Sequence, residues 1–178
     1  LSWLLPEAYK PFTMFPYRFR GPPLDVRTGV GDCRFPYAEY AGIRVYFTSD
    51  MALNDVETVF RGYLEDEGLT GLGRRTRSPH CYVTDRHRPE SGEVIVDIGC
   101  SEGFFSRFYA QEAKRIYLFE GDCKWINPLK CTFSEFLGKT IFTPKFVCAK
   151  SSDSEIRLQD VLPSRSEDDY FLKLDVEG

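Results

Sequence analysis

Residues 93–106 have the sequence Glu93-Val-Ile-Val-Asp97-Ile-Gly99-Cys-Ser-Glu-Gly103-Phe-Phe-Ser106. A short apolar run ends at Asp97, a turn with two glycines follows, and an aromatic segment then takes up helical spacing. Strand, glycine turn and helix in this order are typical of the ligand-binding edge of an open α/β sheet, because glycines let backbone N–H groups approach a ligand closely. The sequence therefore predicts an α/β fold with a ligand site at this turn.

The spacing of the turn distinguishes between ligands. It is Asp-x-Gly-x-x-x-Gly, whereas dinucleotide sites have Gly-x-Gly-x-x-Gly, a tight turn that docks a pyrophosphate on a helix N-terminus. S-adenosylmethionine (SAM) has no phosphate and carries an ammonium and a sulfonium. We therefore expect Asp97 to accept from the methionine ammonium, directly or through water, and Gly99 and Gly103 to leave room for the ligand. The alternative is that Asp97 serves only the turn.

A second apolar run that ends in an acid supports the SAM interpretation. It is Arg115-Ile-Tyr-Leu-Phe119-Glu120-Gly-Asp122, and Glu120 lies about one βα unit after Asp97, where an acid can bind both ribose hydroxyls. The expected cofactor contacts lie in the glycine loop, after this second strand and after the third strand. They are Asp97, Gly99, Cys100, Ser101, Gly103, Glu120, Gly121, Cys148 and Ala149.

Composition excludes several classes of protein. A length of 178 residues allows one domain, or one domain with an extension. The net charge of −4 argues against a general nucleic-acid binder, which needs a basic face. No apolar run approaches the ~20 residues of a membrane-spanning helix. The six cysteines are scattered without a Cys-x-x-Cys pair, so we expect free thiols in a reducing cytoplasm and no metal site.

The chain divides into an N-terminal extension, residues 1–90, and a cofactor-binding core, residues 91–178. Residues 1–40 are rich in aromatics and proline without a period, which predicts an irregular arm lying over the core. Residues 43–47 alternate and predict a strand, and a helix is expected between Asp50 and Gly68. A basic group follows that could attract an anionic acceptor or simply be solvated: Arg74, Arg75, Arg77, Arg86 and Arg88.

Four parallel strands with two intervening helices are expected in the core, in the order 3-2-1-4. The third strand is expected to span Thr140–Cys148 on the sheet edge, because Pro144 cannot donate to a ladder. The helices are expected at 104–109 and at 125–137, with Gly138 as the C-cap of the second. The fourth strand is Tyr170–Leu174. The other two strands are expected at 94–98 and 115–119, and 155–158 can pair locally.

Three runs of this core resemble the FkbM-type SAM-dependent methyltransferases, over roughly residues 78–178. They are Asp97-Ile-Gly-Cys-Ser-Glu-Gly-Phe-Phe-Ser106, Leu118-Phe-Glu120-Gly-Asp122 and Leu172-Lys-Leu-Asp175-Val-Glu177-Gly178. The resemblance implies a Rossmann-like methyltransferase sheet and O-methylation of hydroxyls or carboxyls, often on sugars, polyketides or lipid-linked glycans. The family's sheet has seven strands, so we expect its later strands and part of the acceptor pocket to lie beyond this sequence.

The resemblance also implies roles for individual residues. Asp97, Gly99, Gly103 and Glu120 correspond to SAM contacts, and Asp175 to the acid beside the methyl-transfer centre. A hydroxyl acceptor must also lose its proton, which a positioned carboxylate or histidine can accept.

Asp175, Glu177 and His80 are the candidate catalytic residues. The two acids can instead be a satisfied pair of loop carboxylates, and His80 can be a packed or capping residue. His87, between two arginines, is expected to be solvated.

The leading hypothesis is therefore a SAM-dependent O-methyltransferase acting on a small-molecule or glycan-like acceptor. A non-catalytic SAM-binding or interaction module is the second hypothesis. An NAD-dependent oxidoreductase is disfavoured, because the loop lacks the glycine triplet. One side of Tyr170–Leu174 is expected to be left unpaired by the first four strands. We expect the N-terminal arm, a second copy of the chain or further residues to cover it.

Overall fold

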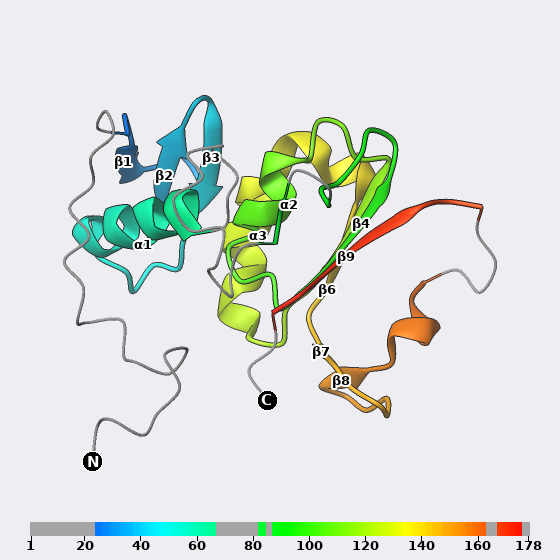
Figure 1. Ribbon diagram of the computed structural model, residues 1–178. Coiled ribbons are helices and arrows are strands. Elements are labelled where there is room, and N and C mark those ends of the chain that lie inside the picture. The colour runs from blue at the N-terminus through cyan, green and yellow to red at the C-terminus, as the bar shows by residue number, and fades with distance from the viewer. Residues whose placement is uncertain (1–23, 67–81, 85–86, 163–166, 176–178) are drawn as a thin grey trace, which may run out of the picture.

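The computed structural model describes residues 24–66, 82–84, 87–162 and 167–175. It is a mixed α/β structure that contains an antiparallel sheet of three strands and a parallel sheet of four (Figure 1). The parallel sheet is compatible with a Rossmann-like fold. Within the described ranges, no helix has both the length and the apolar character needed to span a bilayer.

The parallel sheet consists of β4 (Val94–Ile98), β5 (Arg115–Phe119), β6 (Thr140–Thr143) and β9 (Tyr170–Leu174). Its strands are arranged in the order β6-β5-β4-β9. Every residue of β4 is buried, which explains why its first three residues form a continuous apolar run rather than an alternating pattern. Because the four strands are parallel, their carboxyl ends lie at one edge of the sheet, where the glycine turn follows β4.

The predicted third strand, Thr140–Cys148, is wrong in its length. β6 ends at Thr143, and the chain then forms β7 (Phe146–Val147), which pairs in parallel with β8 (Glu155–Ile156) in a separate two-stranded sheet. The break comes at Pro144, which has no N–H to continue a ladder.

The predicted helix at 125–137 is broken into shorter pieces. A 3-10 helix, η3 (Cys123–Trp125), leads into α3 (Ile126–Thr132), and a second 3-10 helix, η4 (Ser134–Lys139), follows. Phe133 leaves the helix with φ −104°, and its fully buried ring contacts Phe142. Gly138 lies inside η4 rather than at a C-cap. The helix after β4 is also short, α2 (Phe104–Phe108).

Part of the predicted irregular arm, residues 1–40, belongs to a sheet. β1 (Arg27–Val30) and β2 (Pro36–Tyr40) lie in it, and β2 also pairs antiparallel with β3 (Ile43–Tyr46), which confirms the strand predicted at 43–47. Pro36 is the first residue of β2, a position where proline is compatible with a strand. Aromatic residues of this segment pack across the strands, because Tyr37 and Tyr46 meet edge to face at 5.9 Å. Residues 1–23 lie outside the described residues.

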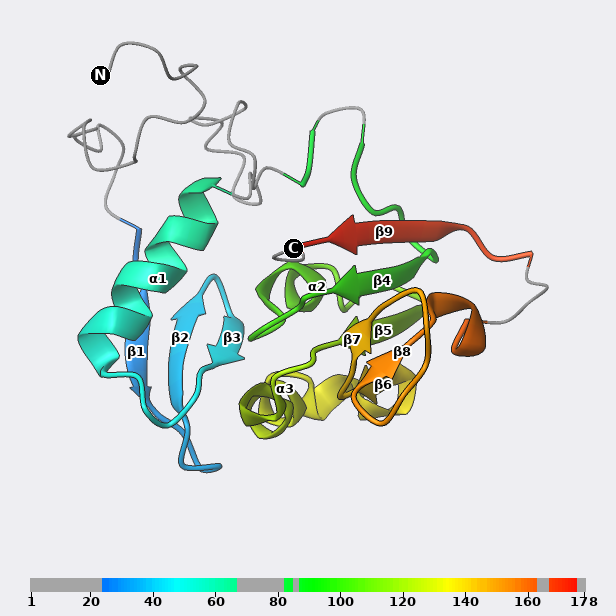
Figure 2. The same cartoon turned by 90° about the horizontal axis from the view of Figure 1, so that it is seen from below.

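The two sheets share one apolar core. α1 (Leu53–Asp66) contacts β1 and β2, and its Phe60 ring meets Phe104 of α2 at 5.0 Å. The backbone N–H of Tyr46 donates to the Thr132 hydroxyl of α3 at 3.0 Å. Figure 2 shows β3 lying next to α3, with α1 and β1 on the far side of β3. The antiparallel sheet is thus attached to the helical face of the parallel one.

The opposite face of the parallel sheet is covered only in part. Val94, Val96 and Ile98 of β4 lie in a second apolar cluster, under residues from β7, β8 and the 3-10 helix η5 (Leu158–Asp160). On β9 the side chains alternate, and the exposed ones are apolar: Tyr170, Leu172 and Leu174. Among the described strands, β9 pairs with β4 alone.

Candidate functional site

The loop that joins β4 to α2 follows an unusual backbone path. Gly99 (φ 72°), Ser101 (φ 47°) and Gly103 (φ 77°) are all left-handed, a conformation that glycine adopts freely and a serine adopts at a cost of about 1 kcal/mol. These turns return the chain from the strand end into α2. Ser101 therefore occupies a strained position in the middle of the loop.

The glycines of this loop leave space for the protein itself. A Cβ atom on Gly99 would overlap the carbonyl oxygen of Asp175 at the end of β9, and one on Gly103 would lie 2.7 Å from the Phe133 ring. The sequence suggested that Gly99 and Gly103 leave room for a ligand. The structure gives a different reason for glycine at both positions, which is close contact with other parts of the protein. Their α-carbons are held against neighbouring elements, which fixes the loop on the sheet edge.

Asp97 is completely buried, at 0% exposure, one residue before the end of β4. One carboxylate oxygen accepts from the Ser106 hydroxyl at 2.7 Å, and the other from the Lys173 ammonium at 3.0 Å. Both oxygens are thus engaged by the protein, and a ligand ammonium has no open path to them in this structure. Asp97 instead ties α2 and β9 to β4.

Lys173 is a site residue that the sequence analysis missed. It projects from β9 into the core, where its ammonium also donates to the Gly99 carbonyl at 3.3 Å and lies 4.9 Å from the centre of the Tyr82 ring. The strand register pairs Asp97 directly with Lys173. A lysine at an inward position of one strand, opposite a buried acid on the next, was the signal available in the sequence.

Glu120 lies at the end of β5 and turns toward the glycine loop. It is 8% exposed, and its carboxylate accepts from the Ser101 N–H at 2.9 Å and from the Asp122 N–H at 2.8 Å. Each carboxylate oxygen has a second acceptor position, which two vicinal hydroxyls can use. Gly121 follows with the Phe146 ring packed directly on it.

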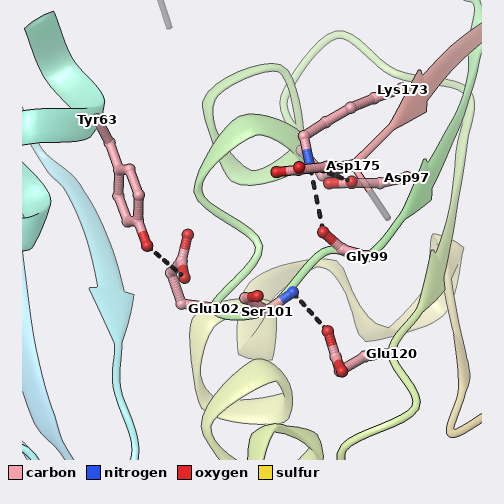
Figure 3. A network of polar contacts seen from close by, with 9 residues as sticks. Tyr63, Asp97, Gly99, Ser101, Glu102, Glu120, Lys173 and Asp175 are labelled. Atoms are coloured by element: carbon pink, nitrogen blue, oxygen red, sulfur yellow. Dashed lines mark hydrogen bonds and ion pairs between the residues drawn. The ribbon is translucent and has the colours of Figure 1, made fainter. Parts of the chain in front are cut away.

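A small cavity of about 40 Å³ opens beside the loop. It is lined by loop residues 99–102, by Tyr63 of α1, and by Lys173 and Asp175 at the end of β9. Figure 3 shows Tyr63 of α1 reaching Glu102 of the loop, and Lys173 and Asp175 approaching Gly99 from β9. Asp175 is 45% exposed and lies 3.8 Å from the Lys173 ammonium. It is the more exposed of the two acids that line the cavity.

Glu102 is the second residue that the sequence analysis missed. Its side chain lines the cavity yet is 4% exposed, and it accepts from the Tyr63 hydroxyl at 3.3 Å. Burial raises the pKa of its carboxyl to about 7, helped by the nearby Asp97 and opposed by Lys173. Nothing in the glycine pattern requires an acid at this position, so the pattern alone could not have identified it.

The remaining predicted site residues lie in the cavity wall, on the surface or outside the described residues. Cys100 is buried, and burial raises the pKa of its thiol well above the usual range, so it is a neutral wall of the cavity. Cys148 and Ala149 are exposed and do not line the cavity. Glu177 and His80 lie outside the described residues, as do Arg74, Arg75, Arg77 and Arg86. Arg88, the described member of the basic group, is exposed. His87 is also exposed, and it stacks on the Phe171 ring at 4.7 Å.

The raised pKa of Glu102 predicts a pH effect on stability. Between its ordinary value of 4.5 and about 7, the folded protein keeps a proton that the unfolded chain releases. The free energy of unfolding should therefore fall through this window as pH rises, by about 3 kcal/mol at most from this group. Urea unfolding at about pH 5 and about pH 8 should show the fall in the wild type and a smaller one in Glu102→Gln. An identical fall in both proteins would contradict the assignment.

No protein-family model, curated protein or solved structure matches this chain. Among the described residues, no three His, Cys, Asp or Glu side chains gather as metal ligands. The grounds for a function are therefore the position of the cavity, its carboxylates and the loop beside it.

Proposed function

We propose that this chain is a SAM-dependent methyltransferase that methylates a hydroxyl or carboxyl group of a sugar, a glycan-like molecule or another small acceptor. The observation that carries the proposal is Glu120, whose carboxylate is held against the glycine loop at the shared edge of β4 and β5. An acid in this position can bind a ribose through both hydroxyls.

The position of the cavity supports a ligand site. In the strand order β6-β5-β4-β9, the chain passes from β4 to β5 and β6 on one side and then crosses to β9 on the other side of β4. Ligands of open α/β sheets bind at such a switch point, at the carboxyl ends of the strands. The cavity is lined by the loop after β4 and by the end of β9, so it lies at this point.

The charge of the site favours SAM over a dinucleotide. Glu102 and Asp175 line the cavity, and Glu120 faces the same loop. Asp175 and Glu120 oppose a pyrophosphate, and all three carboxyl groups can receive a ligand with an ammonium and a sulfonium. α2 has only five residues, so it supplies little helix dipole for a phosphate.

Isothermal titration calorimetry with SAM, S-adenosylhomocysteine (SAH) and NAD tests the proposal. We expect SAM and SAH to bind and NAD not to bind. Methyl transfer is then followed as SAH release with sugars, small alcohols and carboxylic acids as acceptors. Binding of NAD without SAM would overturn the proposal, and binding of SAM without any methyl transfer would favour a non-catalytic SAM-binding module.

Glu120→Gln is expected to weaken SAM binding about 10- to 100-fold, because hydrogen bonds to a charged acceptor contribute about 1.5–3 kcal/mol. Calorimetry measures the change, and 5′-methylthioadenosine, which keeps the ribose, should lose the same factor. Glu112→Gln is the matched control, since Glu112 is exposed in the loop that precedes β5, at the opposite edge of the sheet. Equal SAM affinity in Glu120→Gln and wild type would remove the basis of the ribose assignment.

A further inference from the structure

The carboxyl groups of Asp97 and Glu102 are near each other, but their surroundings differ. Asp97 is closed off by Ser106 and Lys173, whereas Glu102 lines the cavity and has only the Tyr63 hydroxyl as a side-chain hydrogen-bond partner. No ion pair joins Glu102 to another residue in the described parts of the chain. A buried acid beside an open cavity and without a cation is able to receive a positive group from a ligand.

The size of the cavity indicates which part of a ligand it can hold. A volume of about 40 Å³ is room for about three water molecules, which admits a small charged group such as the ammonium of an amino-acid head group rather than an adenine or a sugar. Polar groups of the loop and of β9 surround it. In SAM and SAH, this head group carries the ammonium.

We propose that Glu102, rather than Asp97, receives the ammonium of the amino-acid end of the ligand, and that it loses a proton to solvent when the ammonium binds. The inference rests on the proposed function, since it concerns the same ligand. Before binding, both the protonated and the ionised form of the Glu102 carboxyl are populated near neutral pH. The ammonium stabilises the carboxylate, so the carboxyl proton passes to the buffer and an ammonium–carboxylate pair remains.

The groups that face Glu102 are consistent with this exchange. Tyr63 on α1 donates to the carboxyl and lowers its pKa, Lys173 on β9 lowers it from a distance, and Asp97 on β4 raises it. Cys100 beside it is a neutral thiol. Lys173 is already bound to Asp97 and to the Gly99 carbonyl, so it does not compete with a ligand ammonium for Glu102.

Proton release measured by calorimetry tests the proposal. Titrations with SAH at about pH 7, in buffers of different ionisation enthalpy, should show release of about half a proton per ligand in wild type. SAH has the ammonium but no sulfonium, so the release reports on the amino-acid end. 5′-Methylthioadenosine lacks the amino acid, and its binding should release no proton.

Variants of the two facing residues sharpen the test. Glu102→Gln should abolish the release, weaken SAH binding about tenfold, and leave 5′-methylthioadenosine binding unchanged. Tyr63→Phe should increase the release, because the lost hydrogen bond raises the pKa of the Glu102 carboxyl. Release that persists in Glu102→Gln, that disappears only in Asp175→Asn, or that is equal for both ligands would overturn the assignment to Glu102. If neither ligand binds wild type, the proposed function fails together with this inference.

Discussion

Gly99→Ala is expected to lower the free energy of unfolding by about 4 kcal/mol or more, among the largest effects of a single substitution. A methyl group at this position would overlap the Asp175 carbonyl oxygen, which belongs to the backbone and has no side chain to rotate away. The left-handed φ of 72° adds strain for any residue with a Cβ. Thermal and urea unfolding would measure the loss.

The matched control for this substitution is Gly62→Ala on α1. Apart from its chain neighbours and the backbone of its own helix, no atom lies within 4 Å of the Cβ that this change would add, and alanine in a helix interior is preferred over glycine by about 0.5–1 kcal/mol. One glycine-to-alanine change should therefore destabilise strongly and the other stabilise slightly. If Gly99→Ala unfolds like wild type, the close approach of the loop to β9 is wrong.

Lys173→Met is expected to destabilise the protein by about 3–5 kcal/mol, because it leaves the Asp97 carboxylate buried without its cation. The pair is almost wholly shielded from solvent, and the two strands that carry it are direct neighbours. Unfolding in urea measures the change. Arg157→Met is the control, since the pair of Arg157 with Asp160 is exposed and should contribute less than about 1 kcal/mol.

A double-mutant cycle distinguishes the ion pair from loss of packing. Asp97→Asn alone should also destabilise, because it leaves the Lys173 ammonium buried beside a neutral amide. The double variant Asp97→Asn, Lys173→Met should cost clearly less than the sum of the two single changes. Simple additivity would show that the two side chains do not stabilise each other.

The parallel sheet could be predicted because its central strands are buried on both faces. Residues 94–96 of β4 and 116–119 of β5 are apolar runs, and such runs followed by acids and glycines are distinctive. The antiparallel sheet could not be predicted in the same way. β1 contains Gly29 in close contact with the Tyr37 ring of β2, a fit between strands that appears only when the pairing is known.

In the site, too, local sequence patterns predict some features, whereas others depend on contacts between distant segments. Glycine spacing identified the loop, and strand ends identified Glu120, because both depend on local sequence. The burial of Asp97 depends on Lys173, which is far away in sequence and is brought opposite by the register of β9. The burial of Glu102 depends on Tyr63 of α1, a helix assigned to the extension. Contacts of this kind belong to the tertiary fold, so no local motif contains them.

The backbone hydrogen bonds of the glycine loop have a consequence for the timing of binding. The N–H groups of Gly99, Ser101 and Gly103 donate to the Phe119 carbonyl, the Glu120 carboxylate and the Cys100 carbonyl. A segment held in this way is ordered before any ligand arrives, so binding loses little chain entropy there. Its amide protons should exchange with deuterium as slowly as those of β4 and β5, through global unfolding rather than local opening.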